Sequence, residues 1–414
     1  MQIDLLVERA DRELRQQFYE LEKRTANHQE RVLDAFAAER VADFHLHGST
    51  GYGYGDSGRE VIEHIYAALF GGEAALVRGH FASGTHAISS ALFAVARPGD
   101  EILVGTGQPY DTLHGVLGLS GQGASSLRAW GISTTVIPQL PEGGIDLATA
   151  LKHITPRSKV LYLQRSRGYS WRRAITVLEI GNAIRAVRQV KPDIIVLVDN
   201  CYGEFVEELE PGHVGADLTA GSLIKNPGGG LALSGGYVVG KRDLINLVSE
   251  SLYAPGLGGK VGATTVFNRS ILQGLFMAPT VVEASLKGAM LLARCGELLN
   301  LAVSPGAIDF RSDIIQALGL GSREAVVEFC RGIQRASPID SHVSPEAGSL
   351  PGYDCEVIMA AGTFVQGASS ELSADAPLRE PYAVYVQGGL SYAHVRVAIA
   401  RALSRITRHL SIPG

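Results

Sequence analysis

The sequence predicts an α/β protein whose larger part is a mostly parallel sheet with helices on both faces. From about residue 60 onward, helical stretches alternate with short β-rich runs, which is the pattern of such sheets. The run IIVLV at residues 194–198 is apolar throughout, as expected for a strand that is buried on both faces. A chain of 414 residues also exceeds the usual size of one core, so we expect a second, smaller C-terminal α/β domain.

The expected elements follow from the spacing of the apolar residues. We predict strands at residues 101–105, 134–138, 159–164, 194–199 and 236–240. We predict helices at residues 60–70, 84–96 and 176–190. Past a leucine-rich helical stretch that begins after residue 285, we predict strands at 356–359 and 383–387 and a last helix at 393–410.

These elements divide the chain into three segments. Residues 1–50 are expected to form an N-terminal helical arm, because apolar residues recur at helical spacing among many charged ones. Residues 51–285 form the large domain and residues 286–414 the small C-terminal domain. The arm could pack on its own chain or on a partner subunit.

Composition and charge exclude several classes of protein. Hydrophobic residues make up 46% of the chain and charged residues 19%, which is typical of a soluble globular protein. A net charge of −5 gives no general basic field, so we expect no nucleic-acid partner. The N-terminus has no apolar signal region, and no later run approaches the ~18 uncharged apolar residues of a membrane span, so we expect no membrane anchor.

Cysteine and histidine spacing predicts neither a disulfide framework nor a metal site. The four cysteines lie far apart, without a Cys-x-x-Cys pair, which suits a reducing cytoplasm. His45 and His47 could face the same way on a strand, but their segment offers no recognisable ligand set. We therefore expect a cytoplasmic protein and assign no metal.

Lys225 is the strongest candidate for covalent chemistry. It stands among small residues in the run AGSLIKNPGGG at 220–230, whose glycines let the backbone approach a ligand closely. A lysine amine can form a Schiff base with pyridoxal phosphate, and Ser222 could hold the phosphate of that cofactor. The alternative is a surface lysine that precedes a glycine turn.

Asp199 and a predicted helix N-terminus could complete such a cofactor site. Asp199 follows the apolar strand and lies 26 residues before Lys225, so its carboxylate could keep a pyridine nitrogen protonated. Ser83, Gly84 and Thr85 open an apolar helix, whose first N–H groups could bind a phosphate. The aspartate could instead cap a helix, and the serine and threonine could be ordinary caps without a ligand.

Three tyrosines are further candidates. Tyr110 follows the strand predicted at 101–105, where its ring could stack on a flat cofactor and its hydroxyl could act as an acid or base. Tyr52 and Tyr54 lie in the glycine-rich segment GYGYGDSGR at 51–59. We interpret this segment as a binding loop, since a flexible linker seldom holds so many aromatic residues.

Arginines are candidates for binding the anionic groups of a substrate. Four of them, including Arg165, gather just past a predicted strand in the segment QRSRGYSWRR at 164–173, where a solvated basic turn is the alternative. Arg379 lies in the proline-flanked segment PLREPY at 377–382. Arg379 and Arg396 are the C-terminal candidates for binding a substrate carboxylate, and Arg379, which is flanked by prolines, is the better of the two.

The candidates, taken in order, resemble the cofactor site of the fold type I pyridoxal-phosphate enzymes. More closely, the chain resembles the methionine γ-lyase-related family often called aluminium-resistance proteins, which are relatives of the cystathionine-type lyases. The segments that carry this resemblance are residues 51–59, 82–88, 164–172, 198–205, 221–236 and 374–390. The resemblance implies a seven-stranded, mostly parallel sheet, and a homodimer or homotetramer whose active sites lie between subunits.

The resemblance also implies a role for each residue of the site. Lys225 would be the Schiff-base lysine, Asp199 would pair with the pyridine nitrogen, and Tyr110 would stack on the ring. The phosphate would be held by Ser83, Gly84, Thr85 and Ser222.

Two positions depart from the cystathionine-type lyases. The Tyr-x-Arg that binds the phosphate of a neighbouring subunit reads Tyr52-Gly53-Tyr54 here, so the arginine is missing and Arg59 is one possible replacement. The carboxylate-binding arginine of those enzymes falls near Tyr385, and Arg379 is the replacement that we propose.

The resemblance predicts a pyridoxal-phosphate-dependent carbon–sulfur lyase that acts on a small sulfur-containing amino acid such as methionine or cystathionine. Lys225 would remove the Cα proton and Tyr110 would protonate the departing thiol, in a β- or γ-elimination. One alternative is an aminotransferase or another amino-acid-transforming enzyme on the same fold. The other alternative is a non-catalytic pyridoxal-phosphate-binding stress protein.

Overall fold

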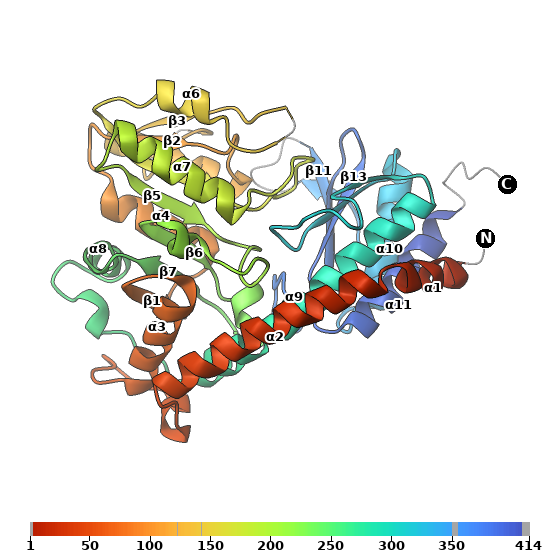
Figure 1. Cartoon of the computed structure of the whole chain (residues 1–414), viewed down its shortest axis with the longest axis horizontal. Coiled ribbons are helices and arrows are strands. Elements are labelled where there is room, and N and C mark those ends of the chain that lie inside the picture. The colour runs from red at the N-terminus through yellow and green to blue at the C-terminus, as the bar shows by residue number, and fades with distance from the viewer. Residues whose placement is uncertain (1–2, 122, 142, 350–354, 408–414) are drawn as a thin grey trace.

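Two sheet-based domains, joined by long helices, make up the chain (Figure 1). The computed structural model describes residues 3–121, 123–141, 143–349 and 355–407. The large domain holds a seven-stranded sheet and the small C-terminal domain a six-stranded sheet. Parallel strands need helical crossovers, which explains the alternation of helical and β-rich segments in the sequence.

The large sheet is mostly parallel, as predicted, with the strand order β1-β7-β6-β5-β4-β2-β3. Only β7 runs antiparallel to its neighbours, β1 and β6. The strands are β1 (Ala74–Arg78), β2 (Glu101–Val104), β3 (Ser133–Val136), β4 (Ser158–Gln164), β5 (Ile195–Asp199), β6 (Leu218–Ser222) and β7 (Gly236–Gly240). The carboxyl ends of β4, β5 and β6 therefore lie side by side at one edge of the sheet.

The five strands predicted for this domain are all present, and β1 and β6 were not predicted. The sequence of β6, LTAGS, contains a glycine and a serine and no branched apolar run, so it lacks the usual strand signal. Strand β1 follows a helix after only three residues, and its short apolar run could equally continue a helical pattern.

Helices cover both faces of the large sheet, as predicted. Helices α4 (Gly84–Val95), α5 (Asp111–Leu117) and α8 (Arg242–Leu252) pack on one face. Helices α3 (Ser57–Phe70) and α7 (Val177–Val190) pack on the other face. Shorter helical segments are α6 (Leu147–Lys152) and the 3-10 turns Asp43–Leu46, Arg128–Trp130, Pro211–Val214, Asn226–Gly228 and Gly258–Lys260.

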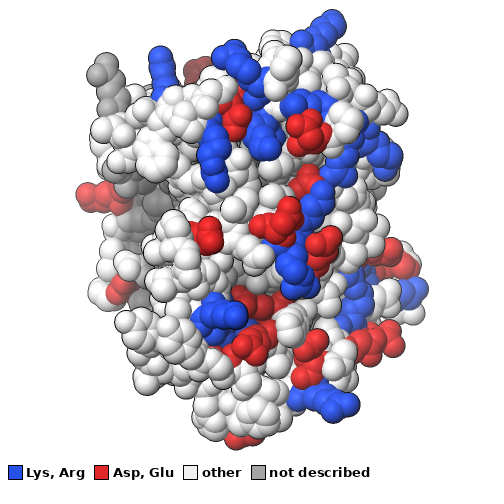
Figure 2. Space-filling model, turned by 90° about the vertical axis from the view of Figure 1, so that its left-hand side faces the viewer, with Lys and Arg blue, Asp and Glu red and all other residues white. Residues whose placement is uncertain are grey.

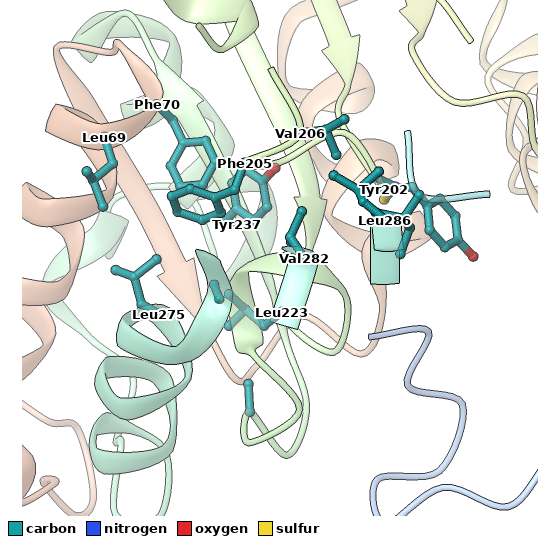
Figure 3. Packing of buried hydrophobic residues seen from close by; sticks show 14 of the residues in the cluster. Leu69, Phe70, Tyr202, Phe205, Val206, Leu223, Tyr237, Leu275, Val282 and Leu286 are labelled. Carbon is teal, nitrogen blue, oxygen red and sulfur yellow. The ribbon is translucent and has the colours of Figure 1, made fainter. Parts of the chain in front are cut away.

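The core beneath the α3 face joins several segments that are distant in sequence. Figure 3 shows Phe70 of α3 against Tyr237 of β7, with Phe205 from the turn after β5 beside them. The ring centroids of Phe70 and Tyr237 lie 5.2 Å apart, and those of Phe70 and Phe205 lie 5.6 Å apart. Aromatic packing of this kind stabilises the turn after β5. That turn is the one that follows Asp199.

The small domain contains an antiparallel sheet of order β10-β11-β12-β13-β9-β8, with two helices packed on it. Its strands are β8 (Ala302–Ser304), β9 (Gln316–Gly319), β10 (Gly348–Ser349), β11 (Glu356–Ala361), β12 (Ser373–Pro377) and β13 (Ala383–Gln387), and its helices are α10 (Arg323–Ala336) and α11 (Tyr392–Ile406). Helix α11 corresponds to the helix predicted at 393–410, of which residues 408–410 lie outside the described part of the chain.

The N-terminal arm packs on its own chain. Helix α1 (Ile3–Glu13) contacts α11 and α9 (Asn268–Leu298), and α2 (Arg15–Ala38) contacts α9 and α3. Figure 1 shows α2 and α9 running side by side from the large domain to the small one. The boundary predicted at residue 286 thus lies within one continuous helix rather than in a linker.

Helix α9 is, within the described residues, the one helix that is long and apolar enough to cross a membrane. In this structure 78% of its most apolar stretch is buried inside the protein, so we interpret it as a core helix.

On the outer face of the large domain, Figure 2 shows acidic and basic side chains intermixed.

Candidate active site

Lys225 lines a cavity of about 140 Å³ at the carboxyl edge of the large sheet. It follows β6 and is half-buried, with its Nζ atom 4.0 Å from the centroid of the Tyr202 ring. Within the described residues its amine has no hydrogen bond or ion pair. The cavity is lined by Ser83, Gly84, Thr85, Ile88, Tyr110, Thr112, Leu113, Gln164, Ser166, Asp199, Cys201, Tyr202, Ser222, Ile224 and Lys225.

The structure brings together all the residues that were predicted to bind the ring and phosphate of a cofactor, apart from the tyrosines at 52 and 54. These residues come from α4, from the N-terminus of α5 and from the ends of β5 and β6. The surface-lysine alternative for Lys225 is excluded, because the side chain is half-buried and lines the cavity. The carboxyl ends of neighbouring strands bring these groups together, and ligands bind at this edge of the sheet in such folds.

Asp199 is held rigidly at the end of β5. Its Oδ2 accepts a hydrogen bond from the Tyr162 hydroxyl at 3.2 Å, and its Oδ1 accepts one from the Cys201 backbone N–H at 3.0 Å. Burial raises the pKa of the Tyr162 hydroxyl well above its ordinary value, so this group remains a donor. These two hydrogen bonds fix the orientation of the Asp199 side chain. Asp199 is thus a fixed carboxylate that lines the cavity.

The N-terminus of α4 opens onto the same cavity. Ser83 caps the helix, since its Oγ accepts a hydrogen bond from the His86 N–H at 3.1 Å. A side chain at Gly84 would bring its Cβ to 3.0 Å from the Cβ of Ser222 and 3.3 Å from the Sγ of Cys201. The glycine therefore lets the first turn of α4 lie directly against the end of β6, where its free N–H groups can bind an anion.

Tyr110 stands at the N-terminus of α5 and lines the cavity. Its backbone N–H donates a hydrogen bond to Oε1 of Gln164 at 2.7 Å. Its ring lies edge-on to that of Tyr169, with 5.7 Å between the ring centroids. Gln164 at the end of β4 therefore fixes the backbone of Tyr110, and Tyr169 in the loop after β4 fixes its ring.

The electrostatics of the cavity keep Lys225 charged when nothing is bound. Burial lowers the pKa of the amine, but the Cys201 thiol, the Tyr202 hydroxyl and the Asp199 carboxylate outweigh this effect and raise the pKa well above its ordinary value. Burial also raises the pKa of the Cys201 thiol and raises that of Tyr202 to about 12. The amine must therefore lose a proton before it can act as a nucleophile or base.

Arg165 does not reach the cavity, which corrects its assignment as a substrate-binding residue. Its guanidinium group is buried and forms ion pairs with Glu207 at 3.0 Å and Glu210 at 3.2 Å. It also donates a hydrogen bond of 2.7 Å to the side chain of Asn200. The alternative of a solvated basic turn is equally wrong for this residue, because its side chain has no exposed surface.

Arg379 lines a second pocket of about 180 Å³ between the two domains. The walls of this pocket include Tyr169 and Trp171 from the loop after β4 and Tyr385 from β13. Tyr169 also packs on Tyr110, so its ring lies between this outer pocket and the Lys225 cavity. Arg379 is thus close to the cavity but not within it.

Tyr52 and Tyr54 lie away from the cavity of their own chain. Each is 68% exposed, and their rings stack on each other with 5.5 Å between centroids. Arg59 is buried and donates hydrogen bonds to the backbone carbonyls of Gly262 at 2.8 Å and Lys260 at 3.1 Å. These contacts hold Arg59 in a structural role within its own subunit.

Several residues of the site were missed by the sequence analysis. Cys201 and Tyr202 follow Asp199 directly, so their position past a strand end was a usable signal. Gln164 and Ser166 lie in the segment that we inspected only for its arginines. Tyr162 reaches Asp199 from within a strand, and no sequence pattern distinguishes it from an ordinary buried tyrosine.

Comparison with known proteins places this chain in a family. The profile of the family described as methionine gamma-lyase matches residues 3–407. The chain belongs to that family. The protein YnbB of Bacillus subtilis is 50% identical over 388 residues, which cover 94% of this chain and 92% of YnbB.

Solved structures of similar proteins agree with this family. One from Listeria monocytogenes, named as a candidate cystathionine beta-lyase involved in aluminium resistance, is 46% identical with a TM-score of 0.96, covering 98% of this chain and 100% of that one. The pyridoxal-phosphate-dependent protein YhfS from Escherichia coli is 18% identical with a TM-score of 0.61, covering 92% and 96% of the two chains, and shares the fold alone. The fold is fold type I, with a smaller C-terminal sheet domain.

The cavity fits pyridoxal phosphate, the cofactor that the methionine gamma-lyase family implies. An amine without a hydrogen-bonding partner among the described residues, a fixed carboxylate and a free helix N-terminus surround one space. The donor set contains a nucleophile for the aldehyde, an anion for the pyridine nitrogen and N–H groups for the phosphate. No group of three or more His, Cys, Asp or Glu side chains suited to a metal occurs within the described residues.

Proposed function

We propose that this protein is a pyridoxal-phosphate-dependent carbon–sulfur lyase that acts on a small sulfur-containing amino acid such as methionine or cystathionine. The observation that carries this proposal is the Lys225 amine, which shares its cavity with Asp199 and with the N-terminus of α4. The family match and the similarity to a candidate cystathionine beta-lyase support the reaction type.

Different residues of the cavity would bind different parts of the cofactor. Asp199 would face the pyridine nitrogen, and Ser83, Gly84, Thr85 and Ser222 would surround the phosphate. When bound, pyridoxal phosphate would act as an electron sink for negative charge that develops at the substrate Cα.

The protein's own groups would move the protons. Lys225, released from the cofactor by the substrate amine, would take the proton from Cα at its Nζ atom. Asp199 would keep the pyridine nitrogen protonated, because both of its oxygens are fixed by donors. The Tyr110 hydroxyl would give a proton to the departing sulfur, in a β- or γ-elimination.

The substrate carboxylate is assigned to Arg379 in the outer pocket. That pocket opens next to Tyr385, at the position where the cystathionine-type lyases have their arginine. Arg379 reaches the pocket from the turn between β12 and β13, so it could replace the missing side chain.

We also propose that the protein works as a homodimer or homotetramer, in which the loop with Tyr52 and Tyr54 completes the site of a neighbouring subunit. The support is that both rings are largely exposed and that neither lines the cavity of its own chain. Size-exclusion chromatography with light scattering tests the assembly, and a monomeric holoenzyme with full activity would contradict it.

The decisive experiment combines borohydride trapping with product analysis. Reduction of the purified yellow protein should attach the cofactor to the peptide that contains Lys225, as read by mass spectrometry. Lys225→Ala should lose this adduct, whereas Lys152→Ala, which changes an exposed lysine of α6, should keep it.

The product analysis separates the proposed reaction from its alternatives. With methionine, cystathionine and cysteine as substrates, we expect release of a thiol (hydrogen sulfide from cysteine), ammonia and a keto acid. Transfer of the amino group to a keto acid without thiol release would identify an aminotransferase. A Lys225 adduct without any turnover across a broad panel of amino acids would identify a non-catalytic binding protein.

A further inference from the structure

Tyr169 and Asp375 form a hydrogen-bonded pair at the junction of the two domains, next to the Lys225 cavity. The Tyr169 hydroxyl donates to Oδ2 of Asp375 at 2.7 Å, and these residues are 206 positions apart in the sequence. Tyr169 belongs to the loop after β4 in the large domain, and Asp375 belongs to β12 in the small domain. This hydrogen bond thus joins the two domains where the outer pocket and the inner cavity meet.

The ring of Tyr169 is the part of the pair that touches the candidate active site. Its centroid lies 5.7 Å from that of Tyr110 and 5.9 Å from that of Tyr385. Gly168, with a φ of 59°, turns the chain so that Tyr169 faces Tyr110, and a residue with a side chain would be strained there. A movement of Tyr169 would therefore change the position of the Tyr110 ring.

Asp375 has a buried carboxyl group, which a purely structural hydrogen-bond acceptor would not need. Only 4% of it is exposed, and its Oδ2 accepts a second hydrogen bond, from Nε2 of Gln387 at 3.0 Å. Within the described residues it has no Lys or Arg partner. Because an asparagine oxygen could accept both hydrogen bonds without the cost of burying a charge, the carboxyl group indicates a role for that charge.

The groups around Asp375 are neutral at pH 7. The groups that face it are Tyr169 from the loop after β4, Tyr202 from the turn after β5, Cys330 from α10, and Tyr385 and Gln387 from β13. Arg167 and Arg379 act on Tyr385 rather than on the carboxyl group itself. Burial raises the pKa of Asp375 to about 6, although the hydrogen bond from Tyr169 opposes this.

We propose that Tyr169 and Asp375 are a positioning pair, in which the ionised carboxylate holds the Tyr169 ring so that Tyr110 is correctly placed over the Lys225 cavity. A hydroxyl group bound to a carboxylate makes a shorter and stronger hydrogen bond than one bound to a neutral acid. Protonation of Asp375 weakens this bond and loosens Tyr110. The inference rests on the proposed function, in which Tyr110 acts on the substrate.

The first test measures kcat and KM for thiol release against pH in the wild-type holoenzyme, Asp375→Asn and Tyr169→Phe. We expect the wild-type kcat to fall as the pH drops through about 6, and Asp375→Asn to lose this step. Tyr169→Phe should lose the step as well and lower kcat by roughly tenfold to a hundredfold, with little change in KM.

Tyr392→Phe is the matched control. The Tyr392 hydroxyl donates to Oδ1 of Asp11, so it joins α11 to α1 by the same kind of bond, and it lines neither pocket. This variant should keep the wild-type pH profile. If it shifts the profile as far as Tyr169→Phe does, or if Asp375→Asn retains the step near pH 6, the proposal is overturned.

A second readout does not depend on turnover. In near-ultraviolet circular dichroism, which reports the packing of tyrosine rings, the wild-type signal should change through about pH 6 and the Asp375→Asn signal should not. Absence of thiol release by the wild-type protein would contradict the proposed function alone. A wild-type dichroism signal that stays constant through this range would overturn the positioning pair alone.

Discussion

The two halves of the candidate active site are built in different ways. The cofactor half, which contains Asp199, Ser222 and Lys225, comes from neighbouring strand ends of one sheet. The substrate half, which contains Tyr169, Asp375 and Arg379, is assembled from a loop of the large domain and from β12 and the turn after it in the small domain. The first half exists once the large domain has folded, whereas the second depends on how the domains dock. We therefore expect changes in the cofactor half to affect the chemical step directly. In the substrate half, we expect changes at Arg379 to affect substrate binding and changes at Tyr169 or Asp375 to affect the rate and its pH dependence.

The largest effect is expected for Asp199→Asn in the cofactor half. The amide cannot hold a proton on the pyridine nitrogen, so thiol release should fall by roughly a hundredfold to ten-thousandfold. The cofactor should still be trapped on Lys225 by borohydride, because the amine and the phosphate site are unchanged. Steady-state kinetics and mass spectrometry measure the two outcomes.

Asp193→Asn is the control for this variant. The Asp193 side chain is 70% exposed and pairs with Lys191, so its loss should leave the rate unchanged. A wild-type rate in Asp199→Asn would show that the cofactor half does not work as proposed.

The next effect concerns Arg165, which was first assigned to the substrate half and is a structural residue. Arg165→Met leaves the buried carboxylates of Glu207 and Glu210 without their cation. Breaking such a buried ion pair costs about 3–5 kcal/mol of the free energy of unfolding. Urea denaturation measures this loss, and the fraction that remains folded should have the wild-type KM. An increased KM with unchanged stability would return Arg165 to the substrate half.

The residues of the cofactor half could be found from the sequence, whereas the role of Arg165 could not. Lys225, Asp199 and Ser83 were found because each follows a strand or opens a helix within a few residues, and the carboxyl ends of parallel strands must meet. Arg165 was wrongly assigned because its acidic partners, Glu207 and Glu210, lie about 40 residues away in the sequence. No local pattern showed that they neutralise it.

Some strands of the fold were predicted from the sequence and others were not. Apolar strands such as β5 were predicted within a residue, whereas β6, which carries Ser222, was missed because its side chains are small. The contact between Tyr169 and Asp375 could not be predicted, because it depends on the docking of two domains.

The third prediction concerns Glu204, whose buried carboxyl group lies in the turn after β5. Burial raises the pKa of Glu204 to about 8, even though Tyr237 donates a hydrogen bond to it at 2.8 Å. Because the folded pKa is raised, the stabilising contribution is complete below the ordinary value of 4.5 and is lost as the pH rises through about 8. Glu204→Gln should therefore gain stability over the wild type by about 2–3 kcal/mol between pH 6 and pH 8.

Urea denaturation at the two pH values measures this gap in the free energy of unfolding. Asp193→Asn, which changes an exposed carboxylate, should show no such gap. A constant difference between Glu204→Gln and the wild type would mean that Glu204 does not titrate between pH 6 and pH 8, which would contradict this prediction.

The smallest effect is expected for Arg379 in the substrate half. Arg379→Met removes the charge from the outer pocket but keeps most of the apolar stem, so the fold should be stable. If the guanidinium binds the substrate carboxylate, KM should rise by roughly tenfold, which corresponds to about 1.4 kcal/mol, with little change in kcat. Arg379→Lys should recover only part of this loss, because a lysine cannot bind a carboxylate through two parallel hydrogen bonds. An unchanged KM in Arg379→Met would mean that the carboxylate is bound elsewhere, and the substrate half would then consist of the Tyr169 and Asp375 pair without a cation from this pocket.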